Sequence, residues 1–157
     1  MATRGPTKKR GTGWRCGSCN ELISSIEDGW VEWLAREQGR GKARVTGLRL
    51  VHQWRPGRAQ CRYDDRAEFR AGNGVVEGLP LERFLGPDGL MLLLSLIAVG
   101  EASLWEVMEL AKRVQVPGYE QAHDRLRAAV AGGRVTPAIG EGFYLQSEIR
   151  AVLIGRM

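Results

Sequence analysis

The spacing of three cysteines and one histidine constrains the fold of this chain more than any other feature. Cys16 and Cys19 form a Cys-Gly-Ser-Cys motif, and His52 and Cys61 follow it after a gap of 32 residues. A tight Cys-x-x-Cys turn lets two thiolates face one ion, and a structural zinc site needs four such ligands in a tetrahedron. The sequence therefore predicts one structural Zn²⁺ per chain, bound by Cys16, Cys19, His52 and Cys61.

Two alternatives to zinc binding remain open for the cysteines. A Cys-x-x-Cys pair can be a redox-active dithiol, although such pairs favour a thioredoxin-like βαβ setting, which this sequence does not predict. The three cysteines could instead be unrelated buried side chains. If zinc is bound, four protein ligands leave no open position for water or substrate, so the site would be structural and not catalytic.

The residues between the two ligand pairs have the pattern of a β-hairpin. Residues 29–37 and 43–54 are strand candidates, and the turn between them, residues 38–42, contains two glycines. Because the strands of a hairpin run out and return, His52 would come back to the Cys-Gly-Ser-Cys turn. We therefore expect a zinc-binding β-hairpin domain of treble-clef-like layout at residues 14–72, after a disordered basic arm at residues 1–13.

The hydrophobic pattern changes after residues 71–80, a glycine-rich stretch that ends in proline and suggests a linker. A helix is expected from Gly86 to about Gly100 with Asp88 as its N-cap, and Ser103 and Glu106 have the spacing of a capping box. The further elements expected are a helical turn at 81–85, helices at 103–114, 119–131 and 147–154, and a hairpin formed by 134–139 and 143–146.

Three helices followed by a two-stranded hairpin is the order of elements in a winged helix. We therefore expect residues 81–157 to form a winged-helix-like, mainly helical domain, and the whole chain to belong to the α+β class. The outward face of the helix at 119–131 carries two acids and only one base. Such a face suits phosphates poorly, so this domain is as well suited to a protein partner as to DNA.

Positive charge is concentrated in the first half of the chain. Residues 1–70 carry a formal net charge of +7, whereas residues 71–157 carry −2. A polyanionic partner should therefore meet the N-terminal half. The alternative is that the basic stretches only improve solubility.

Arginines recur every four residues from Arg58 to Arg70, and they would form one basic ridge if this segment were helical. Arginine forks bind phosphates, and a nearby aromatic plane can stack on a base. In the alternative interpretation the arginines pair with Asp64, Asp65 and Glu68 on a solvated face. The candidate nucleic-acid-binding residues are Lys8, Lys9, Arg10, Trp54, Arg55, Arg58, Arg62, Arg66 and Arg70.

The order of these motifs, CGSC, GLRLVH with a returning cysteine, GPDGLMLLLS and VPGYEQAHDRL, resembles a group of small uncharacterised bacterial proteins. Their shared features are a CxxC…H…C zinc-knuckle head and a winged-helix-like C-terminal part. The resemblance covers about residues 14–150. It implies no activity.

The sequence contains no catalytic signature such as a phosphate-binding loop, a nucleophile elbow or an HExxH motif, so we do not expect an enzyme. Its longest apolar run, Leu90 to Val99, is about half of a membrane span, and no targeting segment is visible, which leaves the cytoplasm as the expected location. The first hypothesis is a zinc-stabilised protein of transcription regulation whose basic half binds nucleic acid or a nucleic-acid-processing complex. The second is a protein-protein adaptor or inhibitor, for example of a polymerase, that does not contact nucleic acid.

Overall fold

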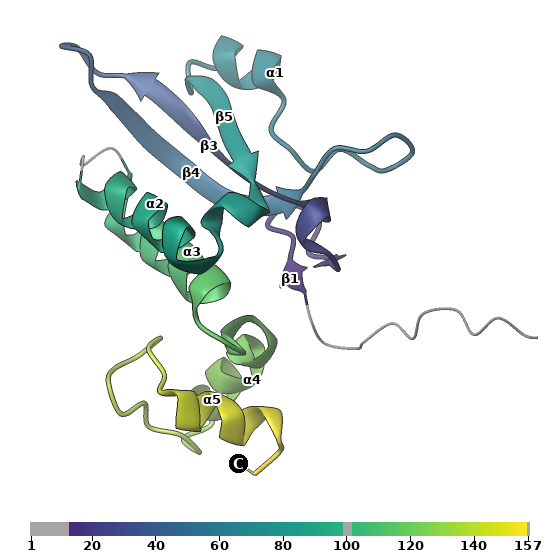
Figure 1. Ribbon diagram of the computed structural model, residues 1–157, viewed down its shortest axis with the longest axis vertical. Coiled ribbons are helices and arrows are strands. Elements are labelled where there is room, and N and C mark those ends of the chain that lie inside the picture. The colour runs from purple at the N-terminus through teal and green to yellow at the C-terminus, as the bar shows by residue number, and fades with distance from the viewer. Residues whose placement is uncertain (1–12, 99–101, 157) are drawn as a thin grey trace, which may run out of the picture.

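The computed structural model describes residues 13–98 and 102–156, so the expected arm, including Lys8, Lys9 and Arg10, lies outside the described residues except for Gly13. The described chain is a mixed α+β structure with small antiparallel sheets and helices. Figure 1 shows its main sheet at one end and the last two helices at the other. Within the described residues, no helix is both long enough and apolar enough to cross a membrane.

The main sheet has three antiparallel strands, β3 (Gly29–Glu37), β4 (Ala43–His52) and β5 (Val75–Pro80), in the order β4-β3-β5. The expected hairpin is confirmed, with strand β3 at its predicted bounds and β4 ending two residues earlier than predicted. Its register shifts between Glu32 and Leu34 of β3, where two residues of β4, Gly47 and Leu48, lie opposite Trp33 alone. Gly47 has a φ of +65°, which a residue with a side chain rarely adopts.

The expected linker at residues 71–80 is wrong, because it contains β5. This strand pairs along β3 from Trp30, opposite Pro80, to Ala35, opposite Val75. A composition rich in glycine and proline suggested an unstructured connection, but Val75, Val76 and Leu79 supply enough strand character to extend the sheet. The short helix α1 (Asp65–Arg70) precedes β5, with Asp64 as its N-cap.

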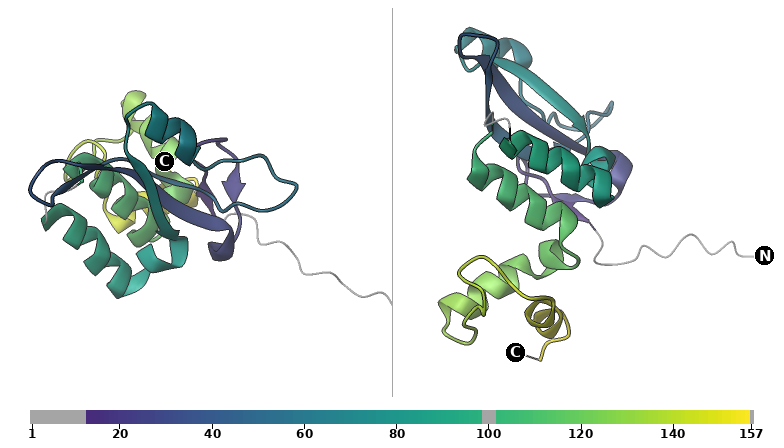
Figure 2. Two further views of the ribbon diagram at one scale, coloured as in Figure 1. Left: turned by 90° about the horizontal axis from the view of Figure 1, so that it is seen from above. Right: turned by 60° about the vertical axis from the view of Figure 1, so that its left-hand side comes forward.

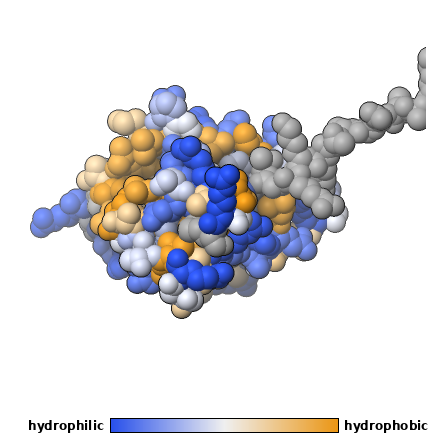
Figure 3. Space-filling model, turned by 90° about the horizontal axis from the view of Figure 1, so that it is seen from below, coloured by the Kyte–Doolittle hydropathy of each residue, from blue (hydrophilic) through white to orange (hydrophobic). Residues whose placement is uncertain are grey.

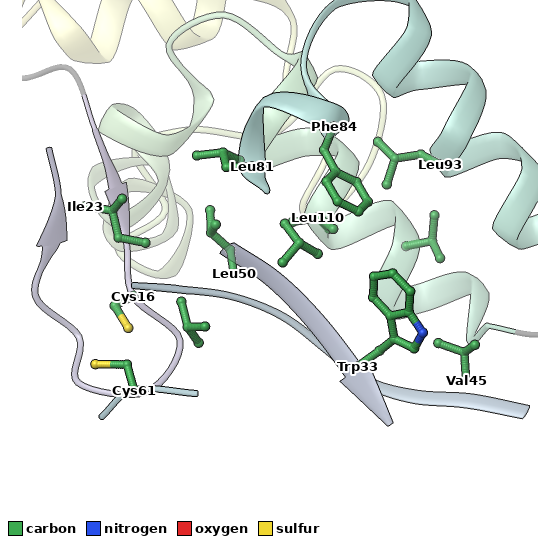
Figure 4. Close-up of a cluster of buried hydrophobic side chains, with 13 residues drawn as sticks. Cys16, Ile23, Trp33, Val45, Leu50, Cys61, Leu81, Phe84, Leu93 and Leu110 are labelled. Atoms are coloured by element: carbon green, nitrogen blue, oxygen red, sulfur yellow. The ribbon is translucent and has the colours of Figure 1, made fainter. Parts of the chain in front are cut away.

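Two antiparallel helices, α2 (Gly86–Ala98) and α3 (Leu104–Gln115), cover one face of the main sheet (Figures 1 and 2). The 3₁₀ turn η2 (Leu81–Phe84) leads from β5 into α2. In Figure 4, Trp33 and Leu50 from the sheet face apolar side chains of these helical segments. The buried residues of this core are Cys16, Ile23, Val31, Trp33, Val45, Leu50, Val51, Cys61, Leu81, Phe84, Leu93, Val107 and Leu110.

A second, smaller core joins α4 (Tyr119–Ala131) to α5 (Gln146–Leu153). Its buried residues are Tyr119, Ala122, Leu126, Ile149 and Val152. The first core contains residues from both sides of the expected linker, from Cys16 to Leu110. The boundary between the two cores therefore lies between α3 and α4 and not at residues 71–80.

Three local expectations for the C-terminal half differ from the structure. Residues 134–146 form no strands, and the expected hairpin is reduced to one bridge between Gly140 and Phe143. Asp88 lies in the first turn of α2 and not at its N-cap. Ser103 precedes α3 as expected but makes no side-chain cap, and Glu106 accepts a hydrogen bond from the backbone N–H of Gly47 and not from Ser103.

Candidate functional site

The four predicted metal ligands come together at one end of the main sheet. Cys16 and Cys19 lie in the turn between two short strands, β1 (Trp14–Arg15) and β2 (Leu22–Ile23). His52 is the last residue of β4, and Cys61 lies in the loop that leads to α1. Their ligand atoms all lie within 4.8 Å of one another, so the four residues are close enough to hold one metal ion.

The orientation of the histidine ring suits metal binding. Nδ1 of His52 lies 3.5 Å from Sγ of Cys19 and 3.7 Å from Sγ of Cys61. On the other side of the ring, Nε2 lies 3.3 Å from the carbonyl oxygen of Leu22. A carbonyl can only accept, so Nε2 carries the proton and the lone pair of Nδ1 faces the sulfur atoms. A carbonyl partner of this kind fixes the tautomer of many metal-bound histidines.

The backbone fixes the Cys-Gly-Ser-Cys turn against β4. The N–H of Gly17 donates to the carbonyl of Leu50 over 2.7 Å, and a Cβ at position 17 would lie 3.2 Å from that oxygen. The turn closes with a hydrogen bond from Asn20 N–H to the carbonyl of Cys16, and the N–H of Ser18 points at the Cys16 sulfur over 3.4 Å. Amide groups that point at sulfur favour the thiolate form.

The thiol groups differ in acidity because their surroundings differ. Burial alone would raise the pKa of Cys16, but hydrogen bonds from the backbone of Cys19, Ser18 and His52 outweigh it and lower this pKa to about 6. Burial, together with the neighbouring Cys19 and Cys16, raises the pKa of Cys61 to about 12. Three thiolates this close therefore need a cation among them, and a bound divalent ion deprotonates coordinating thiols.

The donor set also indicates the kind of ion. Three sulfur atoms and one imidazole nitrogen are among the ligand sets of tetrahedral structural zinc sites, and they suit magnesium and calcium poorly. His52, Cys16 and Cys61 are buried, whereas Cys19 is exposed. With four protein ligands and three of them buried, such a site can stabilise the fold but has no position for a substrate.

A buried carboxylate, Glu32 of β3, supports the loop that carries Cys61. Its oxygens accept hydrogen bonds from the guanidinium group of Arg49 over 2.9 Å and from the backbone N–H of Tyr63 over 3.0 Å. Arg49 also donates to the carbonyl of Cys61 itself, and Arg62 lies 3.7 Å from the carboxylate. Sequence reasoning missed this group, although a single acid inside the apolar stretch WVEWL was a signal for a buried ion pair.

The loop at residues 53–60 presents some of the predicted nucleic-acid-binding residues to solvent. The indole of Trp54 is 56% exposed, and Arg58 is exposed as well. Arg55 is also exposed but pairs with Asp28 over 2.7 Å. Arg62 is only half-exposed, with its guanidinium group 4.5 Å from the ring centre of Trp30, so its contacts are those of a structural residue.

The expected helical ridge from Arg58 to Arg70 does not form. Helix α1 begins only at Asp65, so Arg66 and Arg70 share a helix, whereas Arg58 and Arg62 lie in the preceding loop. Asp64 accounts for the difference, because its side chain caps the helix by accepting a hydrogen bond from the N–H of Ala67. Within residues 13–98 and 102–156, neither Arg58, Arg66 nor Arg70 forms an ion pair.

Comparison of the chain with protein-family models, with curated proteins and with solved structures finds no match. The comparisons do not support the resemblance to small bacterial proteins. The structure supports only two of the features predicted with it, a Cys/His cluster that could bind a metal and a mixed α/β fold.

Proposed function

We propose that this protein is a zinc-stabilised regulatory protein that binds nucleic acid, or a nucleic-acid-processing complex, through its basic N-terminal half. The observation that carries the proposal is the position of the Cys/His cluster. The cluster holds both ends of a loop, from His52 to Cys61, whose exposed side chains include Trp54 and Arg58. A bound metal would thus order a segment that combines an aromatic plane with a guanidinium group, the two groups that bind bases and phosphates.

Zinc is the ion that the donor set supports best, and its role would be to stabilise the fold. The main sheet has only three strands, and its hairpin ends in the ligand His52. Metal binding would add folding free energy to this small unit, as in other zinc-dependent domains. The order of knuckle, hairpin and short helix α1 also supports a treble-clef-like arrangement. The winged-helix-like arrangement of residues 81–157 has weaker support, because no strands follow α4 in the described chain.

Catalysis is not part of the proposal. Four protein ligands would fill the coordination shell of a zinc ion, and the second histidine, His123, contacts the carboxylate of its neighbour Asp124 on α4. The function proposed for this part of the molecule is therefore to bind a partner and not to catalyse a reaction.

The proposal is tested by fluorescence anisotropy with labelled duplex and single-stranded DNA over a range of salt concentrations. Exchange of Arg58, Arg66 and Arg70 for glutamate should weaken binding at least tenfold, because three contacts to phosphates turn repulsive, and it should flatten the salt dependence. The matched control exchanges three exposed arginines of the C-terminal half, Arg134, Arg150 and Arg156, for glutamate. An absence of binding at low salt, or equal effects of both sets, would contradict the proposal.

A second candidate function, that of a protein-protein adaptor or inhibitor, has its own support. Helix α2 exposes a row of apolar side chains that includes Leu90, Met91 and Leu94, with Met91 66% exposed. Exposed apolar patches often mark protein interfaces. Figure 3 views the molecule from the side on which α4 and α5 lie in Figure 1, and it shows that hydrophobic residues (orange) also reach the surface there, among hydrophilic ones (blue).

Affinity purification of the native protein, with and without nuclease treatment, separates the two functions. A stoichiometric protein complex that survives nuclease would favour the adaptor. Partners that are lost on nuclease treatment would favour direct binding of nucleic acid.

A further inference from the structure

The end of the β3–β4 hairpin extends beyond the rest of the main sheet. Strand β5 pairs with β3 only as far as Ala35, opposite Val75, so residues 36–44 continue as a two-stranded ribbon that pairs with no third strand in the part of the chain that the structure describes. In Figures 1 and 2 this ribbon projects past the ends of α2 and β5. Its turn, residues 38–42, is fully exposed.

The ribbon carries four basic side chains and one acid, Glu37. Arg36 of β3 and Arg44 of β4 lie directly opposite each other in the ladder, and Arg40 and Lys42 follow in the turn. Like charges on opposite residues of neighbouring strands destabilise a sheet. Farther along the same ladder the opposed pair is Glu32 and Arg49, which attract each other.

No acid of the protein compensates this charge within the part of the chain that the structure describes. None of the four basic residues forms an ion pair there, and the one hydrogen bond of these side chains runs from the guanidinium group of Arg36 to the carbonyl of Gly72. These like charges destabilise the free protein, and a destabilising arrangement of this kind is typical of a binding site. We therefore expect a partner whose charge neutralises the ribbon. A polyanion is the partner that suits a narrow projecting ribbon whose four cations form no ion pair in the described chain.

The shape of the ribbon favours double-stranded DNA over an RNA duplex or a single strand. The major groove of B-form DNA is about 12 Å wide and admits a two-stranded β-ribbon, whereas the major groove of an RNA duplex is too narrow for side chains to reach the bases. Residues 36–44 contain no aromatic side chain, so the ribbon lacks the stacking surface that single strands require. Arginine is also the side chain that most often contacts guanine in the major groove.

We propose that the β3–β4 ribbon, through Arg36, Arg40, Lys42 and Arg44, inserts into the major groove of double-stranded DNA. The proposal rests on the nucleic-acid-binding function proposed above, and it adds both the surface and the substrate. The ribbon, and not the segment from Arg58 to Arg70, is then the element that enters the groove.

The test compares two triple variants by anisotropy with a 20-base-pair DNA duplex, the RNA duplex of the same sequence and one DNA strand. The ribbon variant carries Arg40→Gln, Lys42→Gln and Arg44→Gln, and the control variant Arg134→Gln, Arg150→Gln and Arg156→Gln, with the same change in net charge. Arg36 is kept because it contacts the carbonyl of Gly72. All substituted residues are exposed and outside the metal cluster, and equal melting temperatures would show that both variants fold.

The expected result is at least a tenfold loss of affinity for duplex DNA in the ribbon variant and less than threefold in the control. The slope of log K against log salt should fall by about 2.7, which corresponds to three lost phosphate contacts. Wild-type protein should also protect guanine N7, which lies in the major groove, from methylation by dimethyl sulfate.

Four results would overturn the inference. If wild-type protein binds DNA but both variants bind equally well, the ribbon is not the contact, while the proposed function stands. Equal affinity for RNA duplex or single-stranded DNA, or unprotected guanine N7, would exclude insertion into the major groove. If wild-type protein binds none of the three probes at low salt, both the inference and the proposed function fail.

Discussion

At the scale of single residues, the candidate metal centre depends on a group that is not a ligand. Glu32 is fully buried, and it holds Arg49 and the backbone of Tyr63, two residues beyond Cys61. The Cys/His cluster could be predicted from sequence because few residue types bind zinc and their spacing is distinctive. The role of Glu32 could not, because its partners become neighbours only when the hairpin and the loop after Cys61 have folded.

We predict that Glu32→Ala destabilises the protein by about 3 kcal/mol, because it leaves the guanidinium groups of Arg49 and Arg62 without their carboxylate. The same variant should lose metal to a competing chelator faster, since the loop with Cys61 is no longer held. Urea denaturation and a chelator competition assay measure the two effects. Glu37→Ala, an exposed glutamate of the same strand, is the control and should change stability by less than about 0.5 kcal/mol. Equal effects of the two variants would contradict this role of Glu32.

At the scale of elements, sequence patterns predicted the long helices and the β3–β4 hairpin well. They failed for segments whose secondary structure depends on tertiary contacts. Helix α4 begins and ends at its predicted residues, because Pro117-Gly118 and Gly132-Gly133 bound it. The segment at 71–80 was misassigned because its glycines suggested a loop. In the structure, Gly74 has a φ of +107°, and Gly78 packs against the indole of Trp30.

Gly74→Ala should therefore be one of the most destabilising alanine substitutions in the chain. The new Cβ would overlap the carbonyl oxygen of Ala35, so β5 would have to move away from β3. We expect a loss of about 3 kcal/mol or more in urea denaturation. Gly57→Ala is a matched control, because Gly57 also has a positive φ but open space around it, and it should cost only about 1–2 kcal/mol. Similar losses for both variants would show that β5 does not pack against β3 as described.

At the scale of the whole molecule, the Cys/His cluster is linked to helices α3 and α4. The residue before the first ligand, Arg15, accepts a hydrogen bond from Arg113 of α3 and donates its N–H to Glu120 of α4, each over 2.6 Å. Trp14 donates to the carbonyl of Arg113, and Arg113 and Glu120 pair with each other. This long-range link joins residues about one hundred positions apart, and no local pattern in the sequence predicts it.

Removal of the metal should consequently loosen the junction of α3 and α4 as well as the ligand turn. We predict that a chelator increases amide hydrogen exchange at residues 13–19 and at the start of α4, where Glu120 loses its hydrogen bond from the backbone N–H of Arg15. Exchange in α5, which has no such contact with residues 13–15, should change much less. Hydrogen-exchange mass spectrometry of protein with and without chelator measures this. A change confined to residues 13–19 and 52–61 would contradict the link.

We infer that Cys16, Cys19, His52 and Cys61 together hold one zinc ion. X-ray absorption at the zinc edge of the native protein tests it most directly, because it reports the atoms bound to the metal. We predict about one zinc per chain, with three sulfur atoms at about 2.3 Å and one nitrogen at about 2.0 Å. A folded protein without zinc, or a first shell of oxygen and nitrogen, would contradict the claim.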